Sequence, residues 1–174
     1  GGDNRSTIRA FRSLGVDITH TGADVIVQGK GWSGLQVPSE TIDCGNSGTT
    51  IRLMSGLLAG RPFASRLDGD ASLRSRPMGR VITPLREMGA NITSEGGENR
   101  APLRINGGEL HGINYRSQVA SAQVKSALLL AGLQARGRTH VWEPIRSRDH
   151  TERMLPAFGV NLIVQDTDVA IDGG

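Results

Sequence analysis

Apolar and polar positions follow the spacing of an amphipathic helix in three segments of the chain. The segments are residues 7–18, 81–92 and 153–162. In each segment we expect a helix, a glycine cap and then a strand. A glycine just past the last apolar position is typical of a left-handed helix cap. The glycines Gly15, Gly89 and Gly159 lie 74 and 70 residues apart, which indicates one recurring pattern.

Two largely apolar stretches also recur and predict buried helices. Residues 50–60 and 123–132 both end in Leu-Leu-Ala-Gly, and these endings lie 72 residues apart. A helix that is apolar on nearly all sides is expected in a protein interior. Short apolar runs, such as residues 25–27 and 169–171, predict strands after the glycine caps. Because both elements recur in the same order, an internal repeat explains them better than coincidental helix ends do.

The repeat predicts an α/β (α+β) fold of βαβαββ units within a single domain, residues 1–174. Two full units fit at residues 41–108 and 109–174, whereas residues 1–34 supply only the second half of a first unit. We therefore expect the buried helix of the first unit to lie upstream of Gly1. A half-unit would expose apolar surface and an unpaired strand edge, which favours self-association.

Composition indicates a folded protein and favours ligands with phosphate or carboxylate groups over nucleic acids. Of the 174 residues, 37% are hydrophobic and 21% are charged, which excludes extensive disorder. Only Lys30 and Lys125 among the 20 basic residues are lysines. Arginine has a planar fork that suits phosphate and carboxylate groups, although a GC-rich genome would produce the same excess. Dense basic runs and stacking aromatic residues are absent, so no nucleic-acid partner is expected.

The chain shows no sequence pattern of a secreted, membrane or metal-binding protein. The single cysteine, Cys44, excludes an internal disulfide framework. No apolar run approaches the length of a membrane span, and no signal-peptide pattern opens the chain. We therefore expect a cytoplasmic protein with no membrane partner. His150 has no second histidine or cysteine at ligand spacing, so no metal site is predicted.

Corresponding helices of related units should point the same way, so their N-termini share one face. Helix N-termini carry partial positive charge and free N–H groups that bind anions. The glycine-rich residues 43–50 precede the first buried helix, where Asn46 and Thr49 could add hydrogen bonds. The alternative is an ordinary turn with a threonine cap, and no P-loop lysine follows. Ser121, at the matching place in the last unit, could cap its helix, bind phosphate or do both.

Arg76 and Arg148, 72 residues apart, occupy equivalent places in two units. Pro77 suits the first turn of a helix, which would put Arg76 at the helix N-terminus. A cation there is unfavourable unless an anion joins it, which favours a binding role. Asp149 and Glu152 have the spacing of a capping box, so we expect structural roles for them. The residues alone thus indicate a repeat domain with an arginine-bearing face for phosphorylated or carboxylated small molecules.

Four motifs resemble, in order, the signatures of the 5-enolpyruvylshikimate-3-phosphate synthase family. They are residues 43–52 (DCGNSGTTIR), 69–78 (GDASLRSRPM), 121–127 (SAQVKSA) and 148–152 (RDHTE). The resemblance covers nearly the whole chain and implies most of the N-terminal one of two domains, each of three βαβαββ units. It also implies transfer of the carboxyvinyl group of phosphoenolpyruvate to the 5-hydroxyl of shikimate 3-phosphate. Phosphate would be released, and no metal or organic cofactor would be needed.

The resemblance further implies which residues bind the two substrates. Shikimate 3-phosphate would contact Ser121, Ala122, Gln123 and Arg148. Phosphoenolpyruvate would lie against Asn46, Gly48, Thr49 and Arg76, with Gln123 touching both ligands. The inhibitor glyphosate occupies this second site in the family. Gly48→Ala in a complete enzyme is therefore expected to lower glyphosate affinity.

Some family features have no counterpart in these residues. The family's Lys-Ser…Arg signature is expected upstream of Gly1, and its acid–base carboxylates in a C-terminal domain. We therefore expect negligible turnover by this chain alone, and a non-catalytic binding fragment or excised domain is the alternative description. UDP-N-acetylglucosamine enolpyruvyl transferases carry a catalytic cysteine where this chain has residues 69–72, whereas Cys44 lies elsewhere. The nucleotide-binding signatures of RNA 3′-phosphate cyclases, which share related folding units, are not visible.

Overall fold

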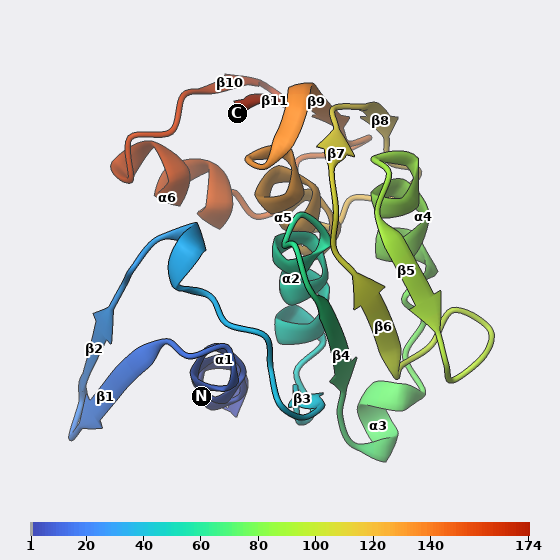
Figure 1. The fold of residues 1–174 in the computed structure, drawn as a ribbon. Coiled ribbons are helices and arrows are strands. Elements are labelled where there is room, and N and C mark those ends of the chain that lie inside the picture. Colours follow the sequence, from blue (N-terminus) through green and yellow to red (C-terminus); the bar gives the residue numbers. More distant parts are fainter. Residues whose placement is uncertain (1) are drawn as a thin grey trace.

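The computed structural model describes residues 2–174, in which central helices lie between two sheets and a hairpin stands to one side (Figure 1). The first part consists of α1 (Gly2–Ser13), β1 (Asp17–Thr21), β2 (Asp24–Gln28) and a 3₁₀ turn (Trp32–Gly34). Gly15 follows α1 with a φ of +81°, a conformation that residues with a side chain rarely adopt. This cap turns the chain into β1, which pairs antiparallel with β2.

The middle part of the chain forms a four-stranded sheet and three helices. Its elements are β3 (Ile42–Asp43), α2 (Gly48–Ala59), β4 (Ala64–Asp68), α3 (Ala71–Arg74), α4 (Gly79–Glu87), β5 (Asn91–Ser94) and β6 (Leu103–Asn106). The strand order is β3-β4-β6-β5. β3 and β4 run parallel, and the other neighbours run antiparallel.

The last part of the chain forms a five-stranded sheet and two helices. Its elements are β7 (Leu110–His111), β8 (Asn114–Arg116), α5 (Ala122–Gly132), β9 (Ala135–Trp142), α6 (His150–Ala157), β10 (Leu162–Gln165) and β11 (Asp168–Gly173). β7 and β8 pair with β9 in parallel, β11 pairs with β9 antiparallel, and β10 pairs with β11. Within residues 2–174, no helix is long and apolar enough to span a membrane.

The order of elements confirms the α/β class and the βαβαββ pattern. Both the middle and the last part contain a strand, an apolar helix, a strand, a second helix and two strands. Gly89 and Gly159 follow the second helices with φ of +97° and +83°, as their caps require. Helix α3 and strand β8 do not belong to the predicted pattern. With four and three residues, they are too short to show a periodic pattern in the sequence.

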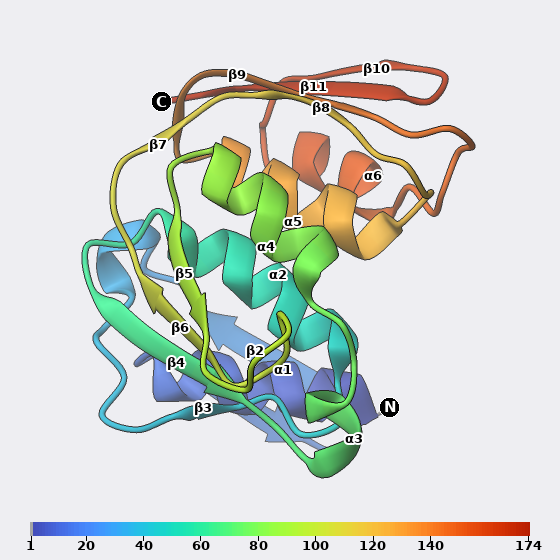
Figure 2. The same cartoon turned by 90° about the vertical axis from the view of Figure 1, so that its right-hand side faces the viewer.

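Helices α2 and α5 lie side by side in the interior and point the same way (Figure 2). Near their C-terminal ends, the Gln134 side chain donates to the Leu57 carbonyl at 3.0 Å. Their backbones touch at Gly56, where a β-carbon would lie 2.0 Å from the Ala127 carbonyl oxygen. Such close packing of two apolar helices fixes their N-termini relative to each other.

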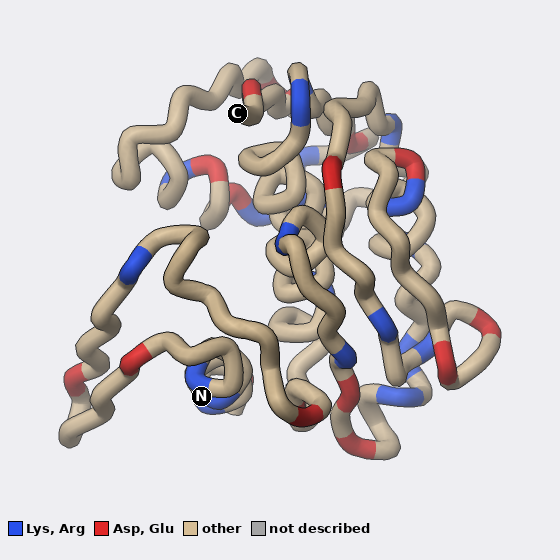
Figure 3. The backbone as a smooth tube through the Cα atoms, in the orientation of Figure 1, with Lys and Arg blue, Asp and Glu red and all other residues tan. Residues whose placement is uncertain are grey.

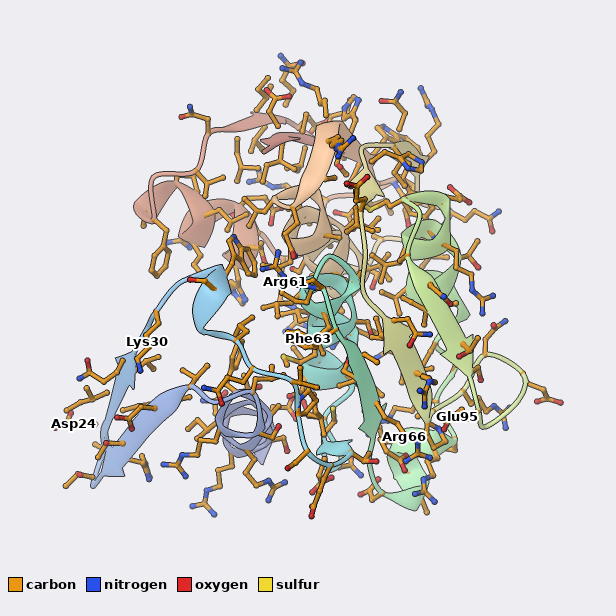
Figure 4. The ribbon with its side chains drawn as sticks, viewed as in Figure 1. Asp24, Lys30, Arg61, Phe63, Arg66 and Glu95 are labelled. Carbon is orange, nitrogen blue, oxygen red and sulfur yellow. The ribbon has the colours of Figure 1, made fainter. Side chains whose placement is uncertain are left out.

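The β1–β2 hairpin leaves apolar surface exposed. Every residue of β2 is exposed, including Val25 and Val27. An apolar cavity of about 530 Å³ lies between α1, the hairpin and the 3₁₀ turn. Arg61, labelled in Figure 4, lies 4.4 Å from the centre of the Trp32 ring, which links this turn to the end of α2.

Candidate functional site

The N-termini of α2 and α5 meet, and side chains of the two helices join there. Gln123 Nε2 donates to Thr49 Oγ1 at 2.9 Å, and Arg52 Nη1 donates to Gln123 Oε1 at 2.9 Å. Ser47 and Ser121 cap the helices, because each hydroxyl accepts a backbone N–H three residues further along. The other N–H groups of both first turns face one region, where their partial positive charges add.

The loop before α2 and the first residue of the helix lie against two guanidinium groups. Gly45 has a φ of +57°, and its N–H donates to the Asp43 carboxylate at 2.7 Å. A β-carbon at Gly48 would lie 2.7 Å from Arg52 Nη1 and 3.0 Å from Arg76 Nη1. The absence of a side chain at position 48 therefore lets both guanidiniums approach the start of α2. An anion placed there could bind both of them.

These two arginines lie close together at the start of α2. Basic and acidic positions are interleaved along the trace (Figure 3), and many pair, as Arg66 and Glu95 do at 2.6 Å (Figure 4). Within residues 2–174, neither Arg52 nor Arg76 forms a salt bridge. Burial lowers the pKa of Arg52, and the charges of Arg76 and Arg80 lower it further. An anionic ligand would relieve this repulsion between like charges.

A second pocket, of about 420 Å³, lies at the start of α5. It is lined by Ala120, Ser121, Ala122, Gln123, Ser147 and Arg148. Arg148 is exposed, and within the part of the chain that the structure describes it has no carboxylate partner. Serine hydroxyls, the N–H groups of a helix start and an arginine fork together suit a phosphate group.

The eight predicted site residues fall into two adjacent groups. Asn46, Gly48, Thr49 and Arg76 surround the start of α2, and Ser121, Ala122, Gln123 and Arg148 border the second pocket. Gln123 also bonds Thr49 in the first group, so it lies where a residue shared by two ligands must lie. The roles of these residues in binding stay predictions.

Two details expected around the first site are wrong. The cap of α2 is Ser47 rather than a threonine, because the loop places the serine one residue before the helix. Helix α4 begins at Gly79, so Pro77 lies before its first turn. Arg76 therefore does not stand at the start of α4, and it donates to the Asn46 side chain beside α2.

The capping box expected at the start of α6 is also wrong. Asp149 precedes the helix but makes no capping hydrogen bond, and it pairs with Arg146 at 3.3 Å. Glu152 turns inward to Lys125 at 2.5 Å. The spacing of Asp149 and Glu152 could not reveal this pair, because Lys125 lies on another helix.

Sequence reasoning missed Arg52 as a candidate binding residue. It follows Gly48 by four residues, so the two share one face of α2, and this spacing was the available signal. The contact of Arg52 with Gln123 could therefore be predicted only once α2 is known to start at Gly48. Residues 2–174 contain no group of three histidine, cysteine, aspartate or glutamate side chains placed to hold a metal.

Comparison with known proteins extends over the whole chain. A family model described as EPSP synthase (3-phosphoshikimate 1-carboxyvinyltransferase) matches residues 1–174. The 3-phosphoshikimate 1-carboxyvinyltransferases of Bacillus licheniformis and Bacillus subtilis are 58% and 56% identical over 174 residues. The match covers 100% of this chain but 41% of each relative. The structure of EPSP synthase from Acinetobacter baumannii matches with a TM-score of 0.97 and 47% identity, over 100% of this chain and 40% of that one.

Proposed function

Because the chain belongs to the EPSP synthase family, we propose that it binds the substrates of a 3-phosphoshikimate 1-carboxyvinyltransferase. This enzyme would transfer the carboxyvinyl group of phosphoenolpyruvate to the 5-hydroxyl of shikimate 3-phosphate and release phosphate. The observation that carries the proposal is the pair of adjacent anion sites joined by Gln123. Both substrates are anionic, and they match arginine forks placed beside helix N-termini.

Shikimate 3-phosphate is assigned to the pocket at the start of α5. Its phosphate would accept hydrogen bonds from Ser121 and from the exposed Arg148. The Gln123 amide, which borders the same pocket, would orient the ring hydroxyls. Ala122 adds no polar group and leaves room for the ring between these donors.

Phosphoenolpyruvate is assigned to the space beside Gly48. Arg52 and Arg76 would hold its phosphate and carboxylate, with Asn46 and Thr49 as further donors. Negative charge that develops on the departing phosphate would be stabilised by the same guanidiniums. Because Gln123 touches both sites, the vinyl carbon would lie next to the attacking hydroxyl, which converts a two-body encounter into a positioned reaction.

We expect this chain alone to bind substrate without turning it over. The reaction protonates a vinyl carbon and removes a hydroxyl proton, so it requires positioned acid–base groups. Two nearby carboxylates are already engaged, because Asp70 accepts from Asn46 at 2.9 Å and Asp43 accepts from Gly45 at 2.7 Å. The acid–base groups would then come from a further domain, since the chain spans about 41% of its relatives' length. A non-catalytic fragment that self-associates through its exposed hairpin is the alternative description of the isolated chain.

Calorimetric titration of shikimate 3-phosphate into the chain tests the proposal. We expect saturable binding that weakens at higher salt, because charge pairs contribute to it. Arg148→Ala should reduce the affinity about tenfold or more, which is the loss of one charge-assisted contact of ~1.5–3 kcal/mol. Arg146→Ala is the matched control, because Arg146 lies two residues away and pairs with Asp149 outside the pocket.

Two further titrations separate the outcomes. UDP-N-acetylglucosamine should not bind, and its saturable binding in place of shikimate 3-phosphate would favour the other enolpyruvyl transferase. Equal losses in Arg148→Ala and Arg146→Ala would mean that general positive charge, rather than the pocket, holds the ligand. Absence of binding by the parent chain would contradict the idea that it carries a working substrate site.

A further inference from the structure

One buried carboxylate joins the two chain segments that form the pocket at the start of α5. Glu143 follows strand β9 and is 1% exposed. Its Oε1 accepts the Ser121 N–H at 2.8 Å, and its Oε2 accepts the Ser147 hydroxyl at 2.8 Å and the Ser147 N–H at 3.4 Å. Ser121 caps α5, and Ser147 precedes Arg148 in the loop before α6. The two oxygens of one side chain therefore bind two residues that line one pocket.

Lys125 orients this carboxylate. The residue is 3% exposed, and its ammonium group lies 2.8 Å from Glu143 Oε2 and 2.5 Å from Glu152 Oε1. Burial alone would raise the pKa of Glu143, but hydrogen bonds from Lys125, Ser147 and Ser121 hold that pKa below its usual value. Glu143 therefore stays ionised at neutral pH and can accept from all three donors at once.

Stability alone does not explain the cluster. Moving an ion out of water costs several kcal/mol, and well-packed apolar residues often replace a buried ion pair without loss of stability. Here two carboxylates share one ammonium, and Glu152 Oε2 is buried without a partner among residues 2–174. Among residues 2–174, the Glu152 carboxylate pairs with Lys125 and accepts no hydrogen bond from Ser121 or Ser147, whereas Glu143 accepts from both. The oxygen positions of Glu143 are the feature that an apolar pair could not supply.

We propose that Glu143 is a positioning residue, whose carboxylate sets the distance between Ser121 and Arg148 across the substrate pocket. The inference rests on the proposed function only for the identity of the ligand. Without the carboxylate, no side chain within residues 2–174 accepts hydrogen bonds from both Ser121 and Ser147, so the start of α5 and the loop before α6 lose their direct link. Arg148, the residue after Ser147, would then lose this anchor, and a phosphate in the pocket would not meet Arg148 and the Ser121 hydroxyl in one geometry.

Glu143→Gln tests, without any ligand, whether the Glu143 carboxylate links Ser121 to Ser147. An amide offers one acceptor oxygen. Its NH₂ group would face either the Lys125 ammonium and the Ser147 N–H, or the Ser121 N–H, all of which are donors. In either orientation of the amide, one of the two backbone N–H bonds is lost. Amide hydrogen exchange of Ser121 or Ser147 should therefore accelerate about tenfold or more, whereas Glu152→Gln should leave both rates unchanged. Unchanged exchange of both amides in Glu143→Gln would overturn the inference.

Binding of shikimate 3-phosphate separates positioning from folding. We expect Glu143→Gln to weaken binding about tenfold, and Glu152→Gln to have little effect. The triple variant Lys125→Met, Glu143→Gln and Glu152→Gln removes all three charges of the cluster, so its melting temperature should equal or exceed that of Glu143→Gln while its binding stays weak. Recovered binding in the triple variant, or equal losses in the two single glutamine variants, would mean that the cluster acts only through stability. If the parent chain does not bind, the proposed ligand is wrong, and the exchange rates still decide whether Glu143 ties the segments.

Discussion

Gly56→Ala tests whether the contact between α2 and α5 sets the geometry of the site. The added β-carbon would lie 2.0 Å from the Ala127 carbonyl oxygen and 2.7 Å from its carbonyl carbon. Ordinary contacts of this kind begin at 3.4 Å, and the obstructing atoms are backbone rather than a movable side chain. The two helices must therefore move apart by about 1.4 Å, a displacement that forfeits much of the dispersion energy between them.

The expected loss of stability follows from two opposing effects. Overfilling a packed core typically costs about 1–3 kcal/mol, and a backbone clash belongs at the upper end. Replacing glycine by alanine inside a helix returns up to about 1 kcal/mol through helix propensity. We therefore expect a net loss of about 2 kcal/mol, which corresponds to ~4–8 °C in melting temperature for a chain of this size.

Urea unfolding followed by circular dichroism measures this loss directly. Gly79→Ala is the matched control, because Gly79 is also helical but its β-carbon would make contacts of 3.5 Å or longer. The control should be neutral or slightly stabilising. Stability of Gly56→Ala equal to that of the parent chain would refute the argument, since it would mean that the helices are not in backbone contact.

Two further predictions concern titratable groups. Burial, assisted by the charges of Asp43 and Asp68, raises the pKa of Cys44 to about 12. Iodoacetamide at about pH 8 should therefore label the Cys44 thiol only in denaturant, and rapid labelling of the folded chain would contradict the burial of Cys44. Burial raises the pKa of Asp68, but hydrogen bonds from Arg74 and Gly69 lower it by a larger amount, so the net pKa lies below 3.8. The ionised carboxylate therefore stabilises the fold above pH 3.8, and this contribution is lost as the pH falls through the folded-state pKa. Asp68→Asn should lose about 1 kcal/mol at neutral pH and show a shallower decline in unfolding free energy below about pH 5; an unchanged acid profile would contradict it.

The repeat could be predicted because its signals are local. Gly15, Gly89 and Gly159 each occupy a left-handed cap that depends on neighbouring backbone alone. The apolar helices α2 and α5 were equally readable, since nearly every position in them is apolar or small. The two groups of predicted site residues also come together, because their motifs lie at the starts of helices that run in the same direction.

The missed features depend on contacts between distant segments. Glu143 lies 22 residues from Ser121, and no periodic pattern connects a residue after a strand to a helix cap. The inward turn of Glu152 likewise depends on where Lys125 emerges from another helix. Arg76 was expected at the start of α4 because Pro77 suits a first helical turn, but that helix begins only at Gly79 and Arg76 turns to Asn46. Such features follow from tertiary packing, which spacing along one segment does not encode.

The backbone contact at Gly56 has a consequence for how two ligands can be recognised together. Helices α2 and α5 are in backbone contact, and each proposed anion site stands at the start of one of them. The separation between the sites is therefore decided when the chain folds, before either ligand arrives. If both proposed sites bind, a first ligand would find this part of its neighbour's place already arranged, and the entropy of arranging it would have been lost during folding rather than during binding.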